Sequence, residues 1–296
     1  MKRGNHMKTA IEQIFEICSR HVVQRGTQGL STPSDFEKAA HWLFEAQRIV
    51  IVTGFTIVAC GIGETDGPSG SVALAAALEK LGKQVCLITD SFSEAIIRNL
   101  VTLMHLDATI LVRRHQQDET ELLSAWEAFQ PDLLVGLERP GRAKNGRVYS
   151  MHALDITEYC PDTDFLFYYA KAQKIPTICI GDGGNEVGMG KVAALVAKQV
   201  PLGETICASF AADILLACGV SNWGGMGLAG LLSIFAKRDV LHTEKEEQSM
   251  IHTMADCGAV DGVLKKIGTT IDGFTLEENL QILRDIQSVV QEDLRA

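Results

Sequence analysis

The sequence lacks the features that mark several large classes of protein. Its longest apolar-rich run, residues 206–220, is interrupted by Asp213 and is too short to cross a bilayer. No long apolar stretch follows the charged residues at the start, so no signal peptide is expected. Asp and Glu number 37 against 27 Lys and Arg, which gives a net charge of −10 without any basic block. We therefore expect a cytoplasmic protein that binds neither membranes nor nucleic acid.

Cysteine is present, but it lacks the spacing of a metal site. The eight cysteines are scattered, and none forms a C-x-x-C pair. Cys86, Cys179 and Cys218 lie inside apolar runs, where cysteine packs as a small hydrophobic side chain. Scattered thiols of this kind indicate a reducing compartment, in agreement with a cytoplasmic location.

Two glycine-rich segments resemble nucleotide-binding motifs without matching them. In residues 61–71, Asp66 stands where a dinucleotide-binding fingerprint needs glycine. In residues 181–191, Asn185 stands where a Walker A motif needs glycine, and Val192 follows where that motif needs Ser or Thr. We expect no P-loop ATP site and no standard NAD site. A divalent metal, Mg²⁺ or Mn²⁺, stays open because both loops carry carboxylates.

The sequence does contain a regular alternation of short apolar runs and helical patterns. Continuous apolar runs predict strands buried on both faces of a parallel sheet, at residues 48–53, 84–89, 108–112, 132–138, 176–180 and 214–220. Helical patterns separate them at residues 69–81, 91–104, 119–129, 163–174, 184–200 and 225–237. This alternation predicts a three-layer α/β fold with a mostly parallel, doubly wound, Rossmann-like sheet.

Further helices are expected at both ends of the chain. Two precede the sheet, at residues 9–24 and 34–47, and one lies near residues 276–294. Residues 237–248 are expected to form an exposed connection. No linker or repeat divides the chain, so we expect one α/β domain over residues 1–296 with a helical extension at about 7–47.

Polar residues follow the predicted strands, at the sheet edge where parallel α/β folds bind ligands. The first loop contains Glu64, Thr65, Asp66, Gly67 and Ser69. Free N–H groups at the start of the next helix suit an anion. Alternatively, Gly67 belongs to a simple turn and Ser69 caps the helix.

The loop after the fifth strand carries Asp182, Asn185 and Glu186. Such a cluster can bind an ammonium group, hold a divalent cation or transfer protons. The alternative is that Asn185 caps a helix and Glu186 complements the helix dipole.

The other strand ends add arginine, asparagine and tryptophan. Arg139 and Arg142 suit two-pronged binding of a carboxylate, or else a surface ion pair with Glu138. Asn222 and Trp223 are candidates for a pocket wall, although Trp223 equally suits the core. His152 is interpreted as a structural histidine.

Four segments together resemble the D-glutamate cyclase family, and more narrowly its C-terminal domain. They are GETDGP at 63–68, ERPGR at 138–142, GDGGNEVGMG at 181–190 and ADILLACGVSNWGG at 212–225. The resemblance implies a lyase that converts D-glutamate to 5-oxo-D-proline with loss of water. Its expected partner is a small carboxylate substrate, and a homo-oligomer is possible.

This chemistry suggests a role for each candidate residue. Asp66 and Asp182 are the proton-transfer pair or metal ligands. Residues expected to assist catalysis or to bind the ammonium group are Glu64, Glu186 and Asn185. Residues expected to bind the substrate are Arg139 or Arg142, Thr65, Asn222 and the N–H groups of Gly67–Ser69. Two alternatives stay open: a metal-dependent enzyme for another small acidic or phosphorylated metabolite, and a non-catalytic domain that senses an amino acid.

Overall fold

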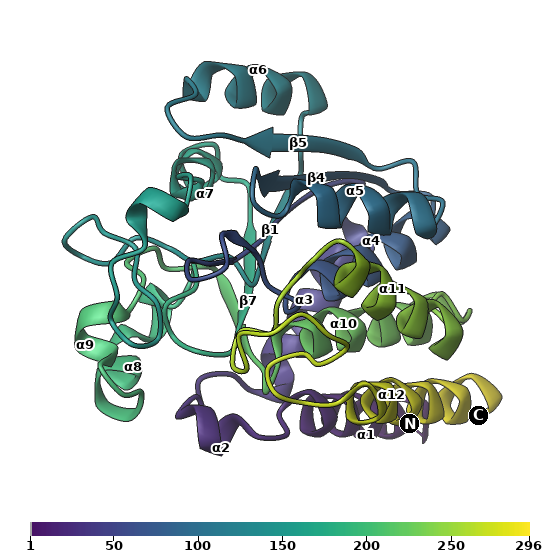
Figure 1. Cartoon of the computed structure of the whole chain (residues 1–296). Coiled ribbons are helices and arrows are strands. Elements are labelled where there is room, and N and C mark those ends of the chain that lie inside the picture. The colour runs from purple at the N-terminus through teal and green to yellow at the C-terminus, as the bar shows by residue number, and fades with distance from the viewer. Residues whose placement is uncertain (1) are drawn as a thin grey trace.

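Six parallel strands form the central sheet of the protein, for which a computed structural model describes residues 2–296 (Figure 1). The strands are β1 (Arg48–Thr53), β4 (Gln84–Asp90), β5 (Thr109–Arg113), β6 (Leu133–Leu137), β7 (Thr177–Gly181) and β8 (Ile214–Ala217). Their spatial order is β5-β4-β1-β6-β7-β8. This is the order of the doubly wound dinucleotide-binding folds, and it reverses direction between β1 and β6.

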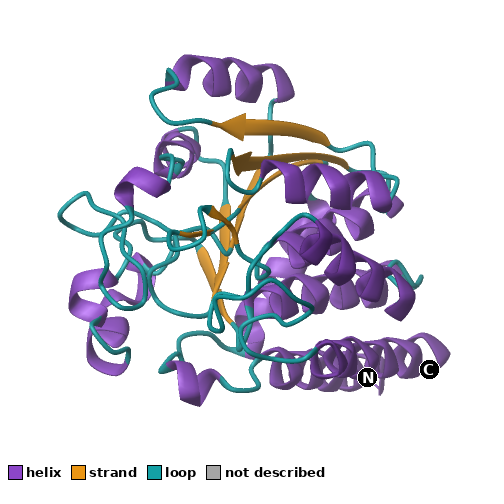
Figure 2. Cartoon of the chain, in the orientation of Figure 1, coloured by secondary structure: helices purple, strands orange, loops and turns teal. Residues whose placement is uncertain are grey.

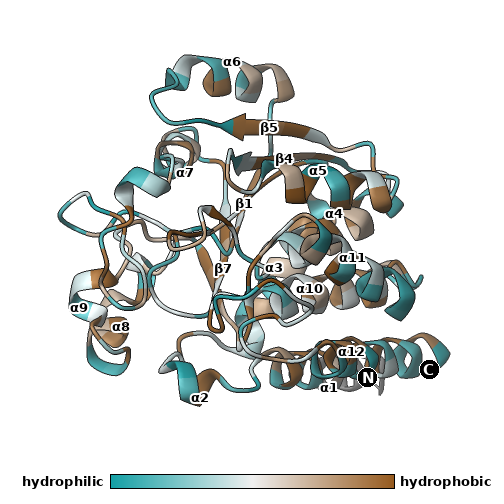
Figure 3. Cartoon of the chain, viewed as in Figure 1, coloured by the Kyte–Doolittle hydropathy of each residue, from teal (hydrophilic) through white to brown (hydrophobic). Residues whose placement is uncertain are grey.

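All six predicted strands are confirmed, and their composition explains why they form. Strand β1 pairs with β4 on one side and β6 on the other, with Ile49 opposite both Val85 and Leu133. A strand with neighbours on both sides and helices on both faces has no exposed face, so an unbroken apolar run is what it needs. Figure 3 shows hydrophobic colour along β5 and β7.

Helices cover both faces of the sheet, which confirms the three-layer arrangement (Figure 2). The helices are α1 (Lys2–Cys18), α2 (Val22–Arg25), α3 (Pro33–Glu45), α4 (Pro68–Lys80), α5 (Glu94–Leu103), α6 (Glu119–Phe129), α7 (Asp164–Ala172), α8 (Ala193–Gln199), α9 (Gly203–Ile206), α10 (Ser221–Ala236), α11 (Glu244–Asp256) and α12 (Leu276–Arg295). One core joins the sheet to α1, α3, α4, α5, α10, α11 and α12. The core on the other face is built with α6, α7 and α8.

Two expectations from the sequence are wrong. Residues 184–200 do not form one helix: the chain stays irregular until the 3-10 turn η2 (Gly190–Val192), because Gly184 and Gly188 have φ values of 115° and 100°. Residues 237–248 are not a simple exposed connection, since α11 begins at Glu244 with a capping box from Thr243.

Smaller departures concern the ends of elements. The predicted helix at residues 9–24 is divided into α1 and α2 at His21, which has a φ of 68°. A two-stranded hairpin, β2 (Thr56–Ile57) with β3 (Ile62–Gly63), follows β1 and was not anticipated.

In residues 2–296, none of the helices has the length and apolar character needed to cross a membrane.

Candidate functional site

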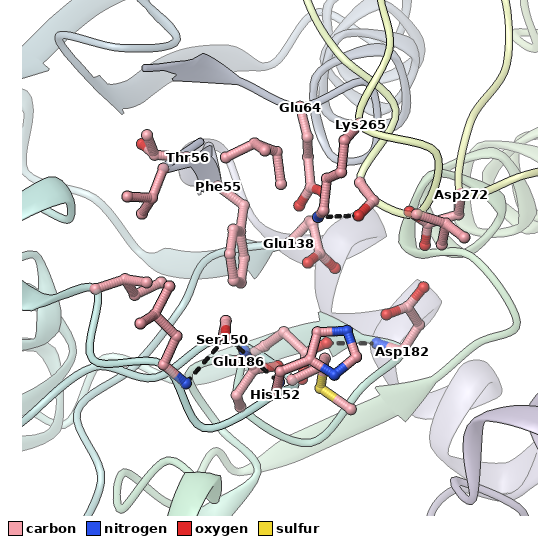
Figure 4. Close-up of a pocket in the computed structure, with 18 of the residues that line it drawn as sticks. Phe55, Thr56, Glu64, Glu138, Ser150, His152, Asp182, Glu186, Lys265 and Asp272 are labelled. Atoms are coloured by element: carbon pink, nitrogen blue, oxygen red, sulfur yellow. Dashed lines mark hydrogen bonds between the residues drawn. The ribbon is translucent and has the colours of Figure 1, made fainter. Parts of the chain in front are cut away.

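A cavity of about 440 Å³ opens where the strand order reverses. Phe55 follows β1, Glu138 follows β6 and Asp182 follows β7, and all three line the cavity (Figure 4). The cavity therefore lies beyond the carboxyl ends of the strands, as the rule for open α/β sheets predicts. The full lining consists of Arg25, Phe55, Thr56, Ile57, Val58, Ala59, Glu64, Glu138, Ser150, Met151, His152, Leu154, Ile156, Asp182, Asn185, Glu186, Gly262, Val263, Lys265 and Asp272.

Three buried carboxylates meet at this edge of the sheet. Oxygens of Asp66, Glu138 and Asp182 lie within 4.8 Å of one another. Asp66 accepts hydrogen bonds from the backbone N–H groups of Ser221 and Asn222, at 2.9 and 2.8 Å, in the first turn of α10. A carboxylate is favourable there because it satisfies free N–H groups and faces the positive end of the helix dipole. The hydroxyl of Ser221 donates to Glu138 Oε2 at 2.6 Å.

The loop after β7 is closed by its own glutamate. Glu186 accepts hydrogen bonds from the backbone N–H groups of Asp182, Gly183 and Gly184, at 3.0, 2.6 and 2.6 Å. Asn185 donates to the carbonyl of Tyr149 at 2.7 Å. Neither residue caps a helix here, because no helix begins until Gly190. The loop instead holds Asp182 in the cavity lining.

Arg25 brings a positive charge from the end of α2 to these acids. Its Nη2 lies 3.1 Å from Asp182 Oδ2 and also pairs with Asp272. Asp182 Oδ2 nevertheless accepts no hydrogen bond within the described chain. Lys265 also lines the cavity, and its Nζ donates to the carbonyl of Gly262 rather than to a carboxylate.

Burial changes the proton affinity of the acids. Removal from water raises the pKa of Asp66 to about 7, and nearby Asp272 adds to the increase. Burial also raises the pKa of Glu64, Glu138 and Asp182 well above the usual range, with further increases from neighbouring carboxylates. Near neutral pH the cluster therefore holds protons as well as negative charge, so it contains both proton donors and proton acceptors.

Several expected site residues support the cavity from behind instead of lining it. The side-chain oxygen of Asn222 accepts from the N–H groups of Gly67 and Gly70, and its Nδ2 donates to the carbonyl of Thr65. Thr65 also donates its hydroxyl to Thr270. With Asp66, these bonds connect the start of α4 to the start of α10. Ser69 is fully buried beside them.

The two expected arginines are engaged elsewhere. Arg139 is fully buried, pairs with Asp90 and donates to the carbonyl of Gly54 and the hydroxyl of Thr163, at 2.8 and 2.9 Å. Arg142 pairs with Asp162 at 2.9 Å. Neither lines the cavity, and neither pairs with Glu138, the alternative that the sequence left open.

Trp223 and His152 occupy different environments. Trp223 is 1% exposed and belongs to the core. His152, which the sequence suggested to be structural, is exposed and lines the cavity.

Sequence reasoning gave Glu138 only as an ion-pair partner of the arginines, and it missed Asp272 and the positive charges of the site altogether. Arg25 lies in a short helix before the sheet, and Lys265 and Asp272 lie in the segment between α11 and α12. None of these residues follows a strand, so the rule that identified Asp182 could not identify them. The one local signal is the glycine-rich, charged stretch at residues 258–273, which separates two amphipathic helices.

The chemistry of the carboxylates also suits a divalent metal. Mg²⁺ and Mn²⁺ favour carboxylate oxygens, and Asp66, Glu138 and Asp182 offer three that converge. Two of these side chains already have partners, since Asp66 accepts three backbone N–H groups and Glu138 accepts from Ser221. Asp182 has the least committed oxygen, although a cation there would compete with Arg25.

Comparison with known proteins gives the chain a family context. The model of a family described as D-glutamate cyclase-like, C-terminal, matches residues 14–287. The human protein named D-glutamate cyclase, mitochondrial, is 34% identical over 245 residues, which are 76% of this chain. The match spans 39% of the length of that human protein.

A solved structure gives a more distant likeness. It is the crystal structure of an exopolyphosphatase-related protein from Bacteroides fragilis, with 12% identity and a TM-score of 0.44. The alignment covers 90% of this chain and 60% of that one. A likeness at this level indicates nothing about function.

Proposed function

The chain belongs to the D-glutamate cyclase-like family, and from this premise we propose that it cyclises D-glutamate to 5-oxo-D-proline and water. Because it spans 39% of the human relative, the activity of that longer protein is a proposal for this chain. The observation that carries the proposal is the cluster of buried carboxylates around Asp182, in a cavity that is also lined by Arg25.

The reaction needs groups that move protons at two places. The α-amino nitrogen attacks the γ-carboxyl carbon, a C–N bond forms, and a C–O bond breaks. The α-ammonium group loses two protons, and both end on the departing oxygen as water. An ionised carboxylate is needed to accept the first proton, and a protonated carboxyl is needed to assist the departing oxygen.

Asp182 and Glu138 are the proposed pair for these transfers. Both line the cavity, and their oxygens are close enough to share protons through the cluster. Asp66 lies behind them and holds the start of α10, and Glu186 fixes the backbone of Asp182. In this proposal Asp66 and Glu186 position the reacting acids.

The substrate's α-carboxylate needs a positive partner, which Arg139 and Arg142 cannot supply from where they lie. Lys265 lines the cavity and donates to a carbonyl instead of forming an ion pair, so we assign it to this binding. Arg25 already pairs with Asp182 and Asp272, so its charge is not assigned to the substrate. The proposed cavity thus folds the substrate so that its amine and γ-carboxyl meet.

The test is turnover by the purified protein. D-glutamate without ATP should yield 5-oxo-D-proline, measured by chiral chromatography against a heat-inactivated sample and against L-glutamate. Folding is confirmed on the same preparation by circular dichroism. A folded protein that gives no product, but whose thermal midpoint rises with D-glutamate, supports the amino-acid-sensing alternative and contradicts the proposal.

A second candidate function rests on the converging oxygens of Asp66, Glu138 and Asp182. It is a metal-dependent enzyme for another small acidic or phosphorylated metabolite, with Mg²⁺ or Mn²⁺ bound by these oxygens. Under this candidate, Mn²⁺ raises the thermal midpoint of the wild type but not of Glu138→Gln, and chelation abolishes turnover. D-glutamate turnover that survives exhaustive chelation favours the first proposal.

A further inference from the structure

The charges around the cavity suit a substrate with one carboxylate better than a substrate with two. Five lining side chains are acids, and two, Arg25 and Lys265, are cationic. Arg25 already forms ion pairs with Asp182 and Asp272, whereas Lys265 donates to the Gly262 carbonyl and its charge acts on Glu64 from a distance. The α-carboxylate of the substrate can pair with Lys265. A second carboxylate would face the five acids of the lining, and each acid that is ionised repels it.

Part of the cavity lining is apolar. Phe55, Ile57 and Val58 come from the β1–β3 segment and line the cavity, where Figure 4 labels Phe55. At the rim, Leu154 and Val263 are 56% and 55% exposed. Each of these exposed apolar side chains offers a surface that an apolar group of a ligand can cover.

The size of the cavity also suits a ligand larger than D-glutamate. A volume of about 440 Å³ lies within the usual range for pockets that enclose ligands of drug size. D-glutamate is far smaller and has only two methylene groups to place against an apolar wall. The cavity therefore has room, lined by apolar side chains, that the amino acid alone leaves unfilled.

From these observations we infer that the preferred substrates are γ-linked D-glutamyl conjugates, in which the γ-carbonyl forms an amide with an apolar amine. This inference rests on the proposed cyclisation and changes only the group that leaves. The γ-carbonyl of such a conjugate is neutral, so the acidic wall no longer opposes a second negative charge. The apolar amine occupies the space beside Phe55 and reaches the rim at Leu154.

The chemistry balances without a co-reactant. The α-amino nitrogen attacks the γ-carbonyl carbon and forms the lactam C–N bond. The C–N bond to the conjugated amine then breaks, and that nitrogen keeps the electron pair. Of the two protons lost by the α-ammonium group, one passes to the leaving nitrogen and the other passes to solvent. The products are 5-oxo-D-proline and the free amine.

The experiment compares three substrates with the full chain: D-glutamate, D-glutamine and D-glutamic acid γ-(4-nitroanilide). Released nitroaniline and 5-oxo-D-proline are both measured, against a heat-inactivated control. We expect kcat/KM to be roughly tenfold or more higher for the anilide than for D-glutamate, in the range that pocket contacts discriminate. D-glutamine, with a neutral γ-carbonyl but no apolar group, should lie between them.

Two matched variants separate binding at the rim from the greater reactivity of an anilide. Leu154→Ser removes a side chain that is 56% exposed at the rim, and Leu202→Ser removes one that is 55% exposed and does not line the cavity. Leu154→Ser should lower the anilide-to-glutamate ratio of kcat/KM by roughly fivefold, because it removes apolar contact only with the conjugate. Leu202→Ser should leave that ratio unchanged.

The outcomes distinguish this inference from the proposed function. Turnover of D-glutamate at least as fast as of the anilide overturns the inference and leaves the proposed function standing. An anilide preference that Leu154→Ser does not alter overturns the assignment of the apolar rim. If a folded protein turns over none of the three substrates, the proposed function itself is wrong. If the protein turns over only the conjugate, the inference is supported, and the leaving group is an amine instead of water.

Discussion

Asp182 is the residue on which the proposed chemistry depends most. It is 4% exposed, it lines the cavity, and its Oδ2 accepts no hydrogen bond within the described chain. Most buried carboxylates are fixed by hydrogen bonds that satisfy both oxygens. Oδ2 also lies 3.1 Å from Arg25 Nη2. A carboxylate oxygen in a cavity that accepts no hydrogen bond can take a proton from the substrate.

Asp182→Asn should lower kcat by roughly 10²–10⁴-fold, the usual range for the loss of an acid–base group. Asn keeps the size of the side chain but cannot accept the proton. The thermal midpoint and kcat are measured on one preparation, with Asp256→Asn on the exposed side of α11 as the control. A folded Asp182→Asn protein with near-normal kcat would remove Asp182 from the mechanism.

Lys265→Met should weaken substrate binding. Its Nζ lines the cavity and donates to the carbonyl of Gly262, and hydrogen bonds to charged groups contribute about 1.5–3 kcal/mol. KM for D-glutamate should rise roughly 10–100-fold, with a smaller change in kcat. Lys266→Met is the matched control, since Lys266 is an exposed neighbour that does not line the cavity. Equal effects from both substitutions would contradict the assignment.

At the scale of elements, parallel packing explains why the strands could be read from the sequence. Strand β1 was predicted at its exact residues, since a strand buried on both faces is an unbroken apolar run between polar ends. The segment 184–200 failed because its apolar residues resemble a helix while Gly184 and Gly188 interrupt it. Helical periodicity alone does not report where a glycine adopts a positive φ.

The same limit applies to the candidate site. Glu64, Asp182, Asn185 and Glu186 were predicted because they follow strands, and all four line the cavity. Arg25 and the loop that carries Lys265 are far from the strand ends in sequence. Both reach the cavity only through tertiary packing. No local pattern encodes such an approach. The arginines that a strand-end rule selects instead bind other parts of the protein.

The end of α2 sets the position of Arg25, and Gly26 makes that position possible. Gly26 has a φ of 76°, and a Cβ there would lie 2.7 Å from the carbonyl oxygen of Gln199. Gly26→Ala should destabilise the protein by more than the roughly 1–2 kcal/mol that positive φ alone costs an L-residue. Because the clash displaces α2, kcat/KM should fall as well.

Gly29→Ala provides the matched comparison for this prediction. Gly29 has a φ of 73°, and nothing lies within 4 Å of the added Cβ. It carries the same backbone strain without the clash, so its activity should stay near the wild-type value. Urea denaturation and steady-state kinetics on both variants measure the difference. Identical stability and activity of the two variants would show that the contact with Gln199 does not position Arg25.

At the scale of the whole molecule, the buried acids should make stability depend on pH. The pKa of Asp66 is raised from 3.8 to about 7 by burial, so the folded state binds this proton more tightly than the unfolded state does. Its contribution is fully present below pH 3.8 and is lost as the pH rises through about 7. The free energy of unfolding that Asp66 supplies therefore falls across this window.

Comparison with Asp66→Asn isolates that contribution from the other titrating groups. The difference in the free energy of unfolding, wild type minus variant, should become less favourable to the wild type between about pH 4 and pH 7. Urea denaturation at a series of pH values, in metal-free buffer, gives the difference. A pH-independent difference, or one that grows as pH rises, would contradict a raised pKa at Asp66.

The central claim is that this chain joins the α-amine of D-glutamate to its own γ-carboxyl carbon. The most direct measurement uses D-glutamate labelled with carbon-13 at the γ-carboxyl and with nitrogen-15, followed by NMR without ATP. We predict a one-bond carbon–nitrogen coupling that grows with wild-type protein and is nearly absent with Asp182→Asn. If folded wild-type protein leaves the label uncoupled, or if the Asp182→Asn variant produces the coupling at the wild-type rate, the account is wrong.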